Sequence, residues 1–167
     1  MKSGQCSLLY SNIVYVGVPV TTWNGTSWSF GAPNSTTRAI FAGSYSSTGD
    51  LYACSVTVNS GTVVFNSGHS LIVVNDVNVP AGRLNFMDKS SLVQINDTAI
   101  NSGNITYRRN ATPMLRFDYT YWSSPVAGQV LNIFSPLTPT DKFYVFDPVA
   151  ANWLNVAASS AMISGKG

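Results

Sequence analysis

The sequence predicts an all-β fold whose main part is a parallel β-helix, or β-solenoid, with coils of 21 residues. Residues 61–76 return as residues 82–97, and Gly, Phe, Ser, Leu, Asn and Asp recur at identical offsets in the two copies. Each copy holds short runs rich in Val, Ile, Leu and Phe, separated by corners of Asn, Ser and Gly. No window of ten residues shows the apolar spacing of a helix. Such a repeat is typical of a solenoid, because one coil buries its apolar face only by stacking on its neighbours.

The repeat also predicts which residues stack on one another. We expect an aromatic stack in the core, formed by Phe65, Phe86 and Tyr107. At one corner, Asn75 and Asn96 should form a stacked amide step. Val58, Val79 and Ile100 keep the same spacing and should form an aliphatic row. The alternative is a β-sandwich whose hairpins happen to resemble each other.

The chain divides into three predicted parts. Residues 1–37 are expected to form an N-terminal cap, residues 38–109 the β-solenoid, and residues 110–167 a β module rich in aromatics and proline that is truncated at its C-terminus. An open solenoid end exposes strand edges and must be covered. Trp23 and Trp28 suit that cap, and the alternative is a carbohydrate platform, because Trp faces stack on sugar rings.

In the third part, Phe117, Tyr119 and Tyr121 alternate with polar residues, which predicts one strand, and residues 143–146 predict another. We therefore expect an antiparallel sheet or a small sandwich packed on the solenoid. Trp122, in the same part, is a third candidate for contact with a glycan.

The composition favours an extracellular protein. Only 10% of the residues are charged and the chain has no Glu, so Ser, Thr, Asn and Gly supply the polarity. The net charge of +2 is too small to indicate a nucleic-acid partner, and the adjacent pair Arg108 and Arg109 is expected on a solvated face. No apolar run is long enough to span a membrane. The first residues do not resemble a signal peptide, so we expect a mature or excised piece.

Two cysteines allow one disulfide. A bridge between Cys6 and Cys54 would tie the N-terminal segment to the first coil, as is typical of exported proteins. The alternative is that Cys54 is a small buried core residue and Cys6 is free.

Candidate chemical groups are few. His69 stands at a predicted corner, without a Cys or acidic partner at ligand spacing, and is expected to be structural. Asp76 and Asp97 form the one stacked acidic pair, and they would repel each other unless they were splayed into water or bridged by a cation such as Ca²⁺. We therefore expect no enzyme and no cofactor, with Asp76 and Asp97 as a calcium candidate.

Several motifs resemble one group of proteins. They are Trp23-Asn24-Gly25 and Asn152-Trp153 together with residues 50–61, 91–97, 118–126 and 141–147. These motifs resemble the N-terminal region of large secreted or surface proteins of Bacteroidota, mostly flavobacterial, which usually end in a type IX secretion sorting domain. The resemblance covers residues 21–167 and implies an adhesin-like protein or a carrier of other modules. No sorting domain is recognisable, so the chain is expected to be part of a longer one. Asp97-Thr98-Ala99 resembles the O-glycosylation sequon of that phylum, which implies a glycan on Thr98.

These observations predict a non-enzymatic structural or adhesive part of a secreted or cell-surface bacterial protein, with the solenoid as a rigid spacer or stalk. The expected partners are other modules of the same longer chain, surface glycans and further copies of the chain. One alternative is a polysaccharide-binding or polysaccharide-active β-helix. Another is a self-assembling extracellular filament subunit, because an uncovered solenoid end can stack head to tail.

Overall fold

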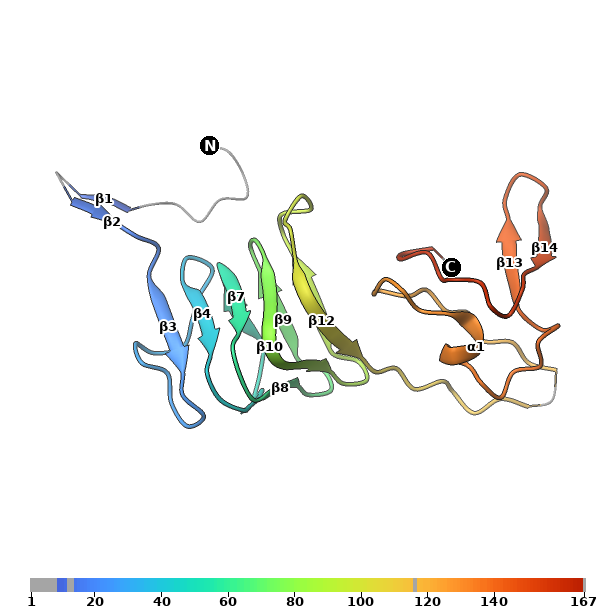
Figure 1. The fold of residues 1–167 in the computed structure, drawn as a ribbon, viewed down its shortest axis with the longest axis horizontal. Helices are drawn as coiled ribbons and strands as arrows, with labels where there is room; N and C mark the ends of the chain where they lie inside the picture. The colour runs from blue at the N-terminus through green and yellow to red at the C-terminus, as the bar shows by residue number, and fades with distance from the viewer. Residues whose placement is uncertain (1–8, 12–13, 116, 167) are drawn as a thin grey trace. The chain divides into compact units, whose positions relative to one another are not determined.

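The computed structural model describes residues 9–11, 14–115 and 117–166. The chain divides into two compact units, residues 1–110 and residues 111–167. The first unit contains a parallel β-solenoid of about four turns, and the second contains a small antiparallel sheet (Figure 1). The predicted all-β fold with a β-helix is therefore confirmed.

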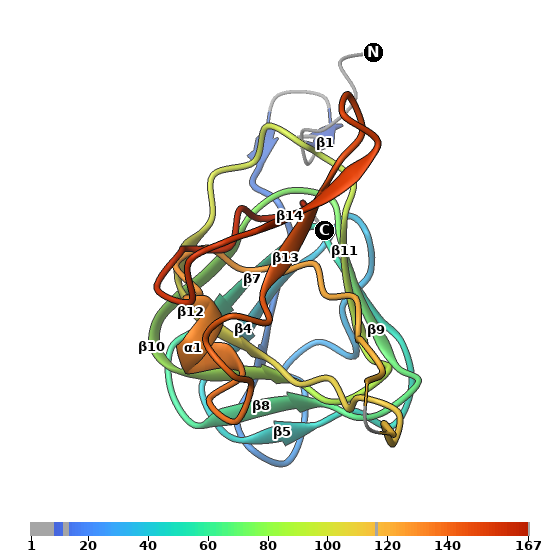
Figure 2. The ribbon, with the colours of Figure 1, turned by 90° about the vertical axis from the view of Figure 1, so that its right-hand side faces the viewer.

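Each coil of the solenoid has three sides, which we number as faces. Face 1 is built in order from β3 (Val20–Trp23), β4 (Arg38–Phe41), β7 (Ser55–Val58) and the first parts of β10 (Val77–Phe86) and β12 (Ser102–Tyr107). Face 2 is built from β5 (Tyr45–Ser46), β8 (Thr62–Phe65) and the second parts of β10 and β12. Face 3 is built from β6 (Leu51–Ala53), β9 (Ser70–Val73) and β11 (Ser91–Gln94). Figure 2 looks along the stack and shows β5 and β8 on one side of the coil and β9 and β11 on another.

The predicted register holds on faces 2 and 3. Leu84 lies opposite Val63, and the phenylalanines one coil apart, Phe65 and Phe86, also pair. The same 21-residue step joins β9 to β11 on face 3. Between residues 61–76 and residues 82–97 the parallel ladders therefore follow the sequence repeat residue by residue. The first coil differs, because β5 pairs with β8 at an 18-residue step and β6 pairs with β9 at a 20-residue step.

The step is not constant at the corner that leads from face 3 to face 1. There Val79 pairs with Gly103, 24 residues later, and Ile100 is 86% exposed. The predicted row of Val58, Val79 and Ile100 is therefore wrong at its last member. Three extra residues extend this corner, and the pairing of β10 with β12 shifts between Val79 and Leu84, after which the 21-residue step returns.

The solenoid begins earlier than predicted. β3 pairs in parallel with β4 from Val20 onward, so the first rung of face 1 lies within residues 1–37, which were predicted as a cap. Thr21 points inward and is only 1% exposed, which places β3 on the core. Before it, β1 (Leu9–Ser11) and β2 (Val14–Val16) pair as a short antiparallel hairpin.

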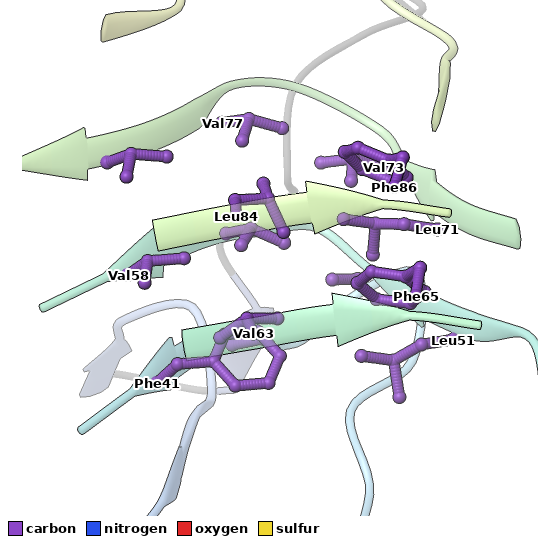
Figure 3. Close-up of a cluster of buried hydrophobic side chains, with 14 residues drawn as sticks. Phe41, Leu51, Val58, Val63, Phe65, Leu71, Val73, Val77, Leu84 and Phe86 are labelled. Carbon is purple, nitrogen blue, oxygen red and sulfur yellow. The ribbon is translucent and has the colours of Figure 1, made fainter. Parts of the chain in front are cut away.

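An aromatic column runs through the core of the solenoid, formed by Phe41, Tyr45, Phe65, Phe86 and Tyr107. Phe65 and Phe86 are stacked with 5.4 Å between ring centroids, and Phe86 and Tyr107 are stacked at 4.8 Å. These spacings are close to the separation of neighbouring strands, so each ring lies on the ring of the coil below. Figure 3 shows Phe65 and Phe86 among the inward aliphatic side chains. The predicted aromatic stack is confirmed, and it extends into the first coil.

Glycines form the tight corner between faces 1 and 2. Gly61 and Gly82 have φ of 76° and 80°, a region that side chains with a Cβ rarely adopt. A Cβ added to Gly82 would lie 2.7 Å from the carbonyl oxygen of Gly61. The stacked corners are therefore so close that only glycine fits in this position.

The second unit contains one antiparallel hairpin and one short helix. β13 (Tyr144–Asp147) pairs with β14 (Asn152–Asn155), and α1 spans Leu131–Phe134. The predicted strand at Phe117, Tyr119 and Tyr121 is wrong. Phe117 has a φ of 80°, and the Asp118 carboxylate accepts a hydrogen bond from the Leu115 N–H at 2.8 Å, so the chain turns there.

Substitution of the corner glycine tests this packing. We expect Gly82→Ala to lower the free energy of unfolding by about 2–4 kcal/mol, because it adds an overlap with the neighbouring coil to an unfavourable φ. Gly68→Ala is the matched control, since Gly68 has a φ of 81° but nothing lies within 4 Å of an added Cβ. That change should cost about 1 kcal/mol in a urea titration. Equal losses for the two variants would contradict the close approach of the coils.

Candidate functional site

A loop closes the N-terminal end of the solenoid. The Ser29 N–H donates to the Thr22 carbonyl at 3.0 Å, and the Thr21 hydroxyl donates to the Gly31 carbonyl at 2.9 Å. Trp23 and Trp28 form an antiparallel bridge in the same loop. The outer edge of β3 is therefore paired with its own loop.

The two tryptophans of this loop pack on the end of the aromatic column. The Trp28 ring centroid is 5.3 Å from that of Phe41, and the Trp23 centroid is 5.1 Å from that of Tyr45. The Trp23 indole N–H also donates to the Ser44 carbonyl at 2.8 Å. This packing favours the cap over the carbohydrate platform, and glycan contact at Trp23 and Trp28 stays a prediction.

Burial at this end also affects Tyr45. Desolvation raises the pKa of its phenol above the usual value, because the charged phenolate is disfavoured away from water. Tyr45 therefore packs against the cap as a neutral phenol.

Arg109 closes the other end of the aromatic column, a role that the sequence analysis missed. Its guanidinium carbon lies 4.6 Å from the centroid of the Tyr107 ring, which is a cation–π contact. The same guanidinium donates to the carbonyls of Met87 and Ser90 at 3.0 and 2.6 Å. The Tyr107 hydroxyl accepts a hydrogen bond from the Leu92 N–H of the edge strand β11. The sequence did contain one signal for this role, because Arg109 closely follows Tyr107, the last aromatic residue of the repeat.

The predicted amide step is present. The Asn96 side-chain amide donates to the Asn75 side-chain oxygen (Oδ1) at 3.3 Å, and the Asn75 side-chain nitrogen in turn lies 3.9 Å from the Cys54 sulfur. Cys54 is buried and takes part in a disulfide. Its predicted partner, Cys6, lies outside the described residues, so the pairing of Cys6 with Cys54 stays a prediction.

The two members of the calcium candidate have different surroundings next to the 24-residue corner. Asp76 accepts a hydrogen bond from the Asn78 side chain, while Asp97 is exposed in the extended turn. The Val77 N–H next to this corner donates to the Asn101 side chain at 2.8 Å. Within the described ranges, no group of three His, Cys, Asp or Glu residues is placed to hold a metal ion. The calcium ion stays a prediction without a ligand set around it.

The half-buried His69 and the buried Ser47 form a hydrogen-bonded pair at the corner between faces 2 and 3. The Ser47 hydroxyl lies 2.8 Å from the His69 Nδ1 atom and accepts a hydrogen bond from the Asn66 N–H at 2.8 Å. Ser47 is only 3% exposed, so a substrate does not reach this hydroxyl. The pair holds two coils together, which agrees with the expected structural role of His69.

Thr98 is exposed on the extended turn. Its hydroxyl and its N–H both donate to the Asn96 side-chain oxygen, at 2.8 and 3.1 Å. Asn24 with Thr26 and Asn34 with Thr36 form the same turn. The motif therefore has a local structural use, and O-glycosylation of Thr98 stays a prediction.

The second unit carries a cluster of exposed rings that the sequence analysis did not identify as a site. We call it the aromatic face, and it consists of Tyr119, Tyr121, Tyr144, Phe146 and Trp153. Its ring centroids are 5.2–5.8 Å apart in three contacts. Trp122 is not among these contacts and packs edge-on against Phe134 at 5.0 Å instead. Glycan contact at Trp122 stays a prediction.

Residues 14–167 match a family described as a domain of unknown function (DUF8693). Because the match covers most of the chain, the protein belongs to this family. Neither the curated proteins nor the solved structures gave a match. Among the described residues, no helix is long and apolar enough to cross a membrane.

The structural role of Trp28 can be tested directly. We expect Trp28→Ala to lower the free energy of unfolding by about 2–3 kcal/mol, because it uncovers the end of the aromatic column. Phe30→Ala is the control from the same loop, since the Phe30 side chain is 85% exposed, and it should change stability by less than about 0.5 kcal/mol. Urea titrations followed by circular dichroism measure both. A neutral Trp28→Ala variant would mean that the tryptophan is not part of the cap.

Proposed function

We propose that this protein is a non-enzymatic structural or adhesive part of a secreted or cell-surface protein, with the solenoid as a rigid spacer. The observation that carries the proposal is the aromatic column, which is covered by Trp28 at one end and by Arg109 at the other. A stack of coils with closed ends and continuous parallel ladders is stiff and self-contained. These are the properties that a spacer between modules needs.

Two further features support an extracellular location. Cys54 takes part in a disulfide, and disulfides persist mainly in oxidising compartments. The polar surface is supplied by Ser, Thr and Asn, with only 10% charged residues. The resemblance to type IX secreted proteins of Bacteroidota agrees with this location and stays a hypothesis about the source.

Polysaccharide binding is the second candidate, and the aromatic face of the second unit favours it. Polysaccharide cleavage has less support, because it needs clustered carboxylates and, of the candidate pair, the Asp76 carboxylate already accepts a hydrogen bond from the Asn78 side chain. The filament subunit also has less support, since the loop around Trp28 pairs with the first strand edge. Growth by stacking coil on coil would have to displace that loop.

Sedimentation velocity over a hundredfold concentration range tests the closed spacer. We expect one species whose sedimentation coefficient does not grow with concentration, because both ends of the coil stack are occupied by side chains. Species that lengthen with concentration would contradict the spacer and support the filament.

Location is tested separately on the cells that make the protein. An antibody against the purified chain should label intact cells, and protease added outside should remove the label. Labelling that appears only after lysis would contradict the proposed extracellular role.

A further inference from the structure

The aromatic face is organised by the hairpin of the second unit. Strand pairing places Phe146 opposite Trp153, and Tyr144 lies two residues earlier on the same side of β13. Tyr119 contacts Tyr144 with 5.8 Å between centroids, and Tyr121 contacts Trp153 at 5.7 Å. The ring contacts thus form a pair, Tyr119 with Tyr144, and a trio, Tyr121 and Phe146 with Trp153, and strand β13 places Tyr144 and Phe146 on the same side of the hairpin.

These rings are not used as core. Their exposed fractions run from 40% for Tyr144 to 77% for Tyr121, whereas Phe143, next to the face, is buried. The opposite side of the hairpin carries the aliphatic residues Val145 and Leu154 instead. Aromatic and aliphatic side chains are thus separated onto two faces. An exposed apolar cluster of this kind marks an interaction site.

The charged groups around the face, among the described residues, carry no excess of positive charge. Lys142 is ion-paired with Asp141 at 2.8 Å, and the hydrogen bond between them raises the pKa of Lys142, with a smaller contribution from Tyr144 and Tyr119. The carboxylates of Asp118 and Asp147 accept hydrogen bonds from nearby backbone N–H groups and keep their negative charge. One lysine against three aspartates disfavours an anionic ligand.

Ring chemistry then points to the kind of ligand. The face of an aromatic ring is electron-rich and attracts positively polarised groups, and the C–H groups on one side of a pyranose ring are such groups. The three tyrosines add phenol hydroxyls that donate and accept hydrogen bonds, which suits the hydroxyls at the edge of a sugar.

We propose that the aromatic face of the second unit binds a neutral polysaccharide. This inference rests on the proposed adhesive function and gives it a ligand class. It differs from the prediction at Trp23 and Trp28, whose rings pack on the end of the solenoid core. The exposed rings of the second unit offer their faces without any loss of core packing.

Affinity electrophoresis of the whole chain tests the proposal, with gels that contain xylan, mixed-linkage β-glucan or mannan. We expect retardation in at least one of these neutral gels and none in polygalacturonate. The double variant Tyr121→Ala with Trp153→Ala should weaken that retention by about tenfold or more, because central aromatic anchors carry most of the affinity of a site. Tyr52→Ala is the matched control, an exposed tyrosine on face 3 of the solenoid, and it should bind like the unchanged chain.

The single variant Tyr121→Ala removes the most exposed ring and guards against misfolding of the double variant. Circular dichroism should show that both variants keep their fold. No retention in the three neutral gels, retention in polygalacturonate alone, or unchanged retention of both variants would overturn the proposal. A dimer of the unchanged chain that the double variant dissociates would identify a protein interface instead. None of these results depends on the antibody labelling of intact cells, so failure of the ligand and failure of the extracellular role are distinguishable.

Discussion

The solenoid depends on parallel hydrogen bonding that places equivalent residues of successive coils about 4.8 Å apart. An aromatic ring stacks well at nearly this distance, and Phe86 and Tyr107 are separated by 4.8 Å. A single aromatic residue at one fixed offset in each coil therefore produces a continuous column. The same constraint explains the corner glycines, because coils so close together leave no room for a Cβ at Gly82.

The ends of such a stack require residues that a middle coil does not. Trp28 covers the first rings of the column, and the Arg109 guanidinium lies over the last one. Because these side chains occupy both ends, they support the proposal that the coil stack is a spacer rather than a unit of a polymer. The second unit has a different organisation, in which aromatic rings stay exposed on and beside a hairpin. This difference supports the proposed division between a spacer and a contact surface.

Much of the solenoid could be predicted from the sequence, because strands in register must repeat their inward residues. The pairing of Phe65 with Phe86 and the step from Asn75 to Asn96 follow from matched offsets alone. The position of Ile100 could not be predicted, because in the sequence an exposed Ile resembles an inward one. The corner takes up three extra residues there, and the ladder of β10 with β12 shifts register after Val79. The first rung, β3, was missed because its 18-residue step to β4 does not match the repeat.

The candidate site was harder to predict than the fold. The alternation at Phe117, Tyr119 and Tyr121 resembles a strand, but the positive φ of Phe117 breaks it, and only the tertiary structure brings Tyr121 to Trp153. Similarly, Arg109 follows the last aromatic of the repeat, but only the folded structure shows that its guanidinium lies over the Tyr107 ring.

Amide hydrogen exchange measured by mass spectrometry tests the central claim most directly, namely that the stacked coils form one cooperative body closed at both ends. The account predicts that peptides from β7, β8, β9 and β10 share the slowest exchange, and that Arg109→Ala accelerates β11 and β12 first. Independent, fast exchange of the three faces, or no effect of the Arg109 change on these two strands, would contradict it.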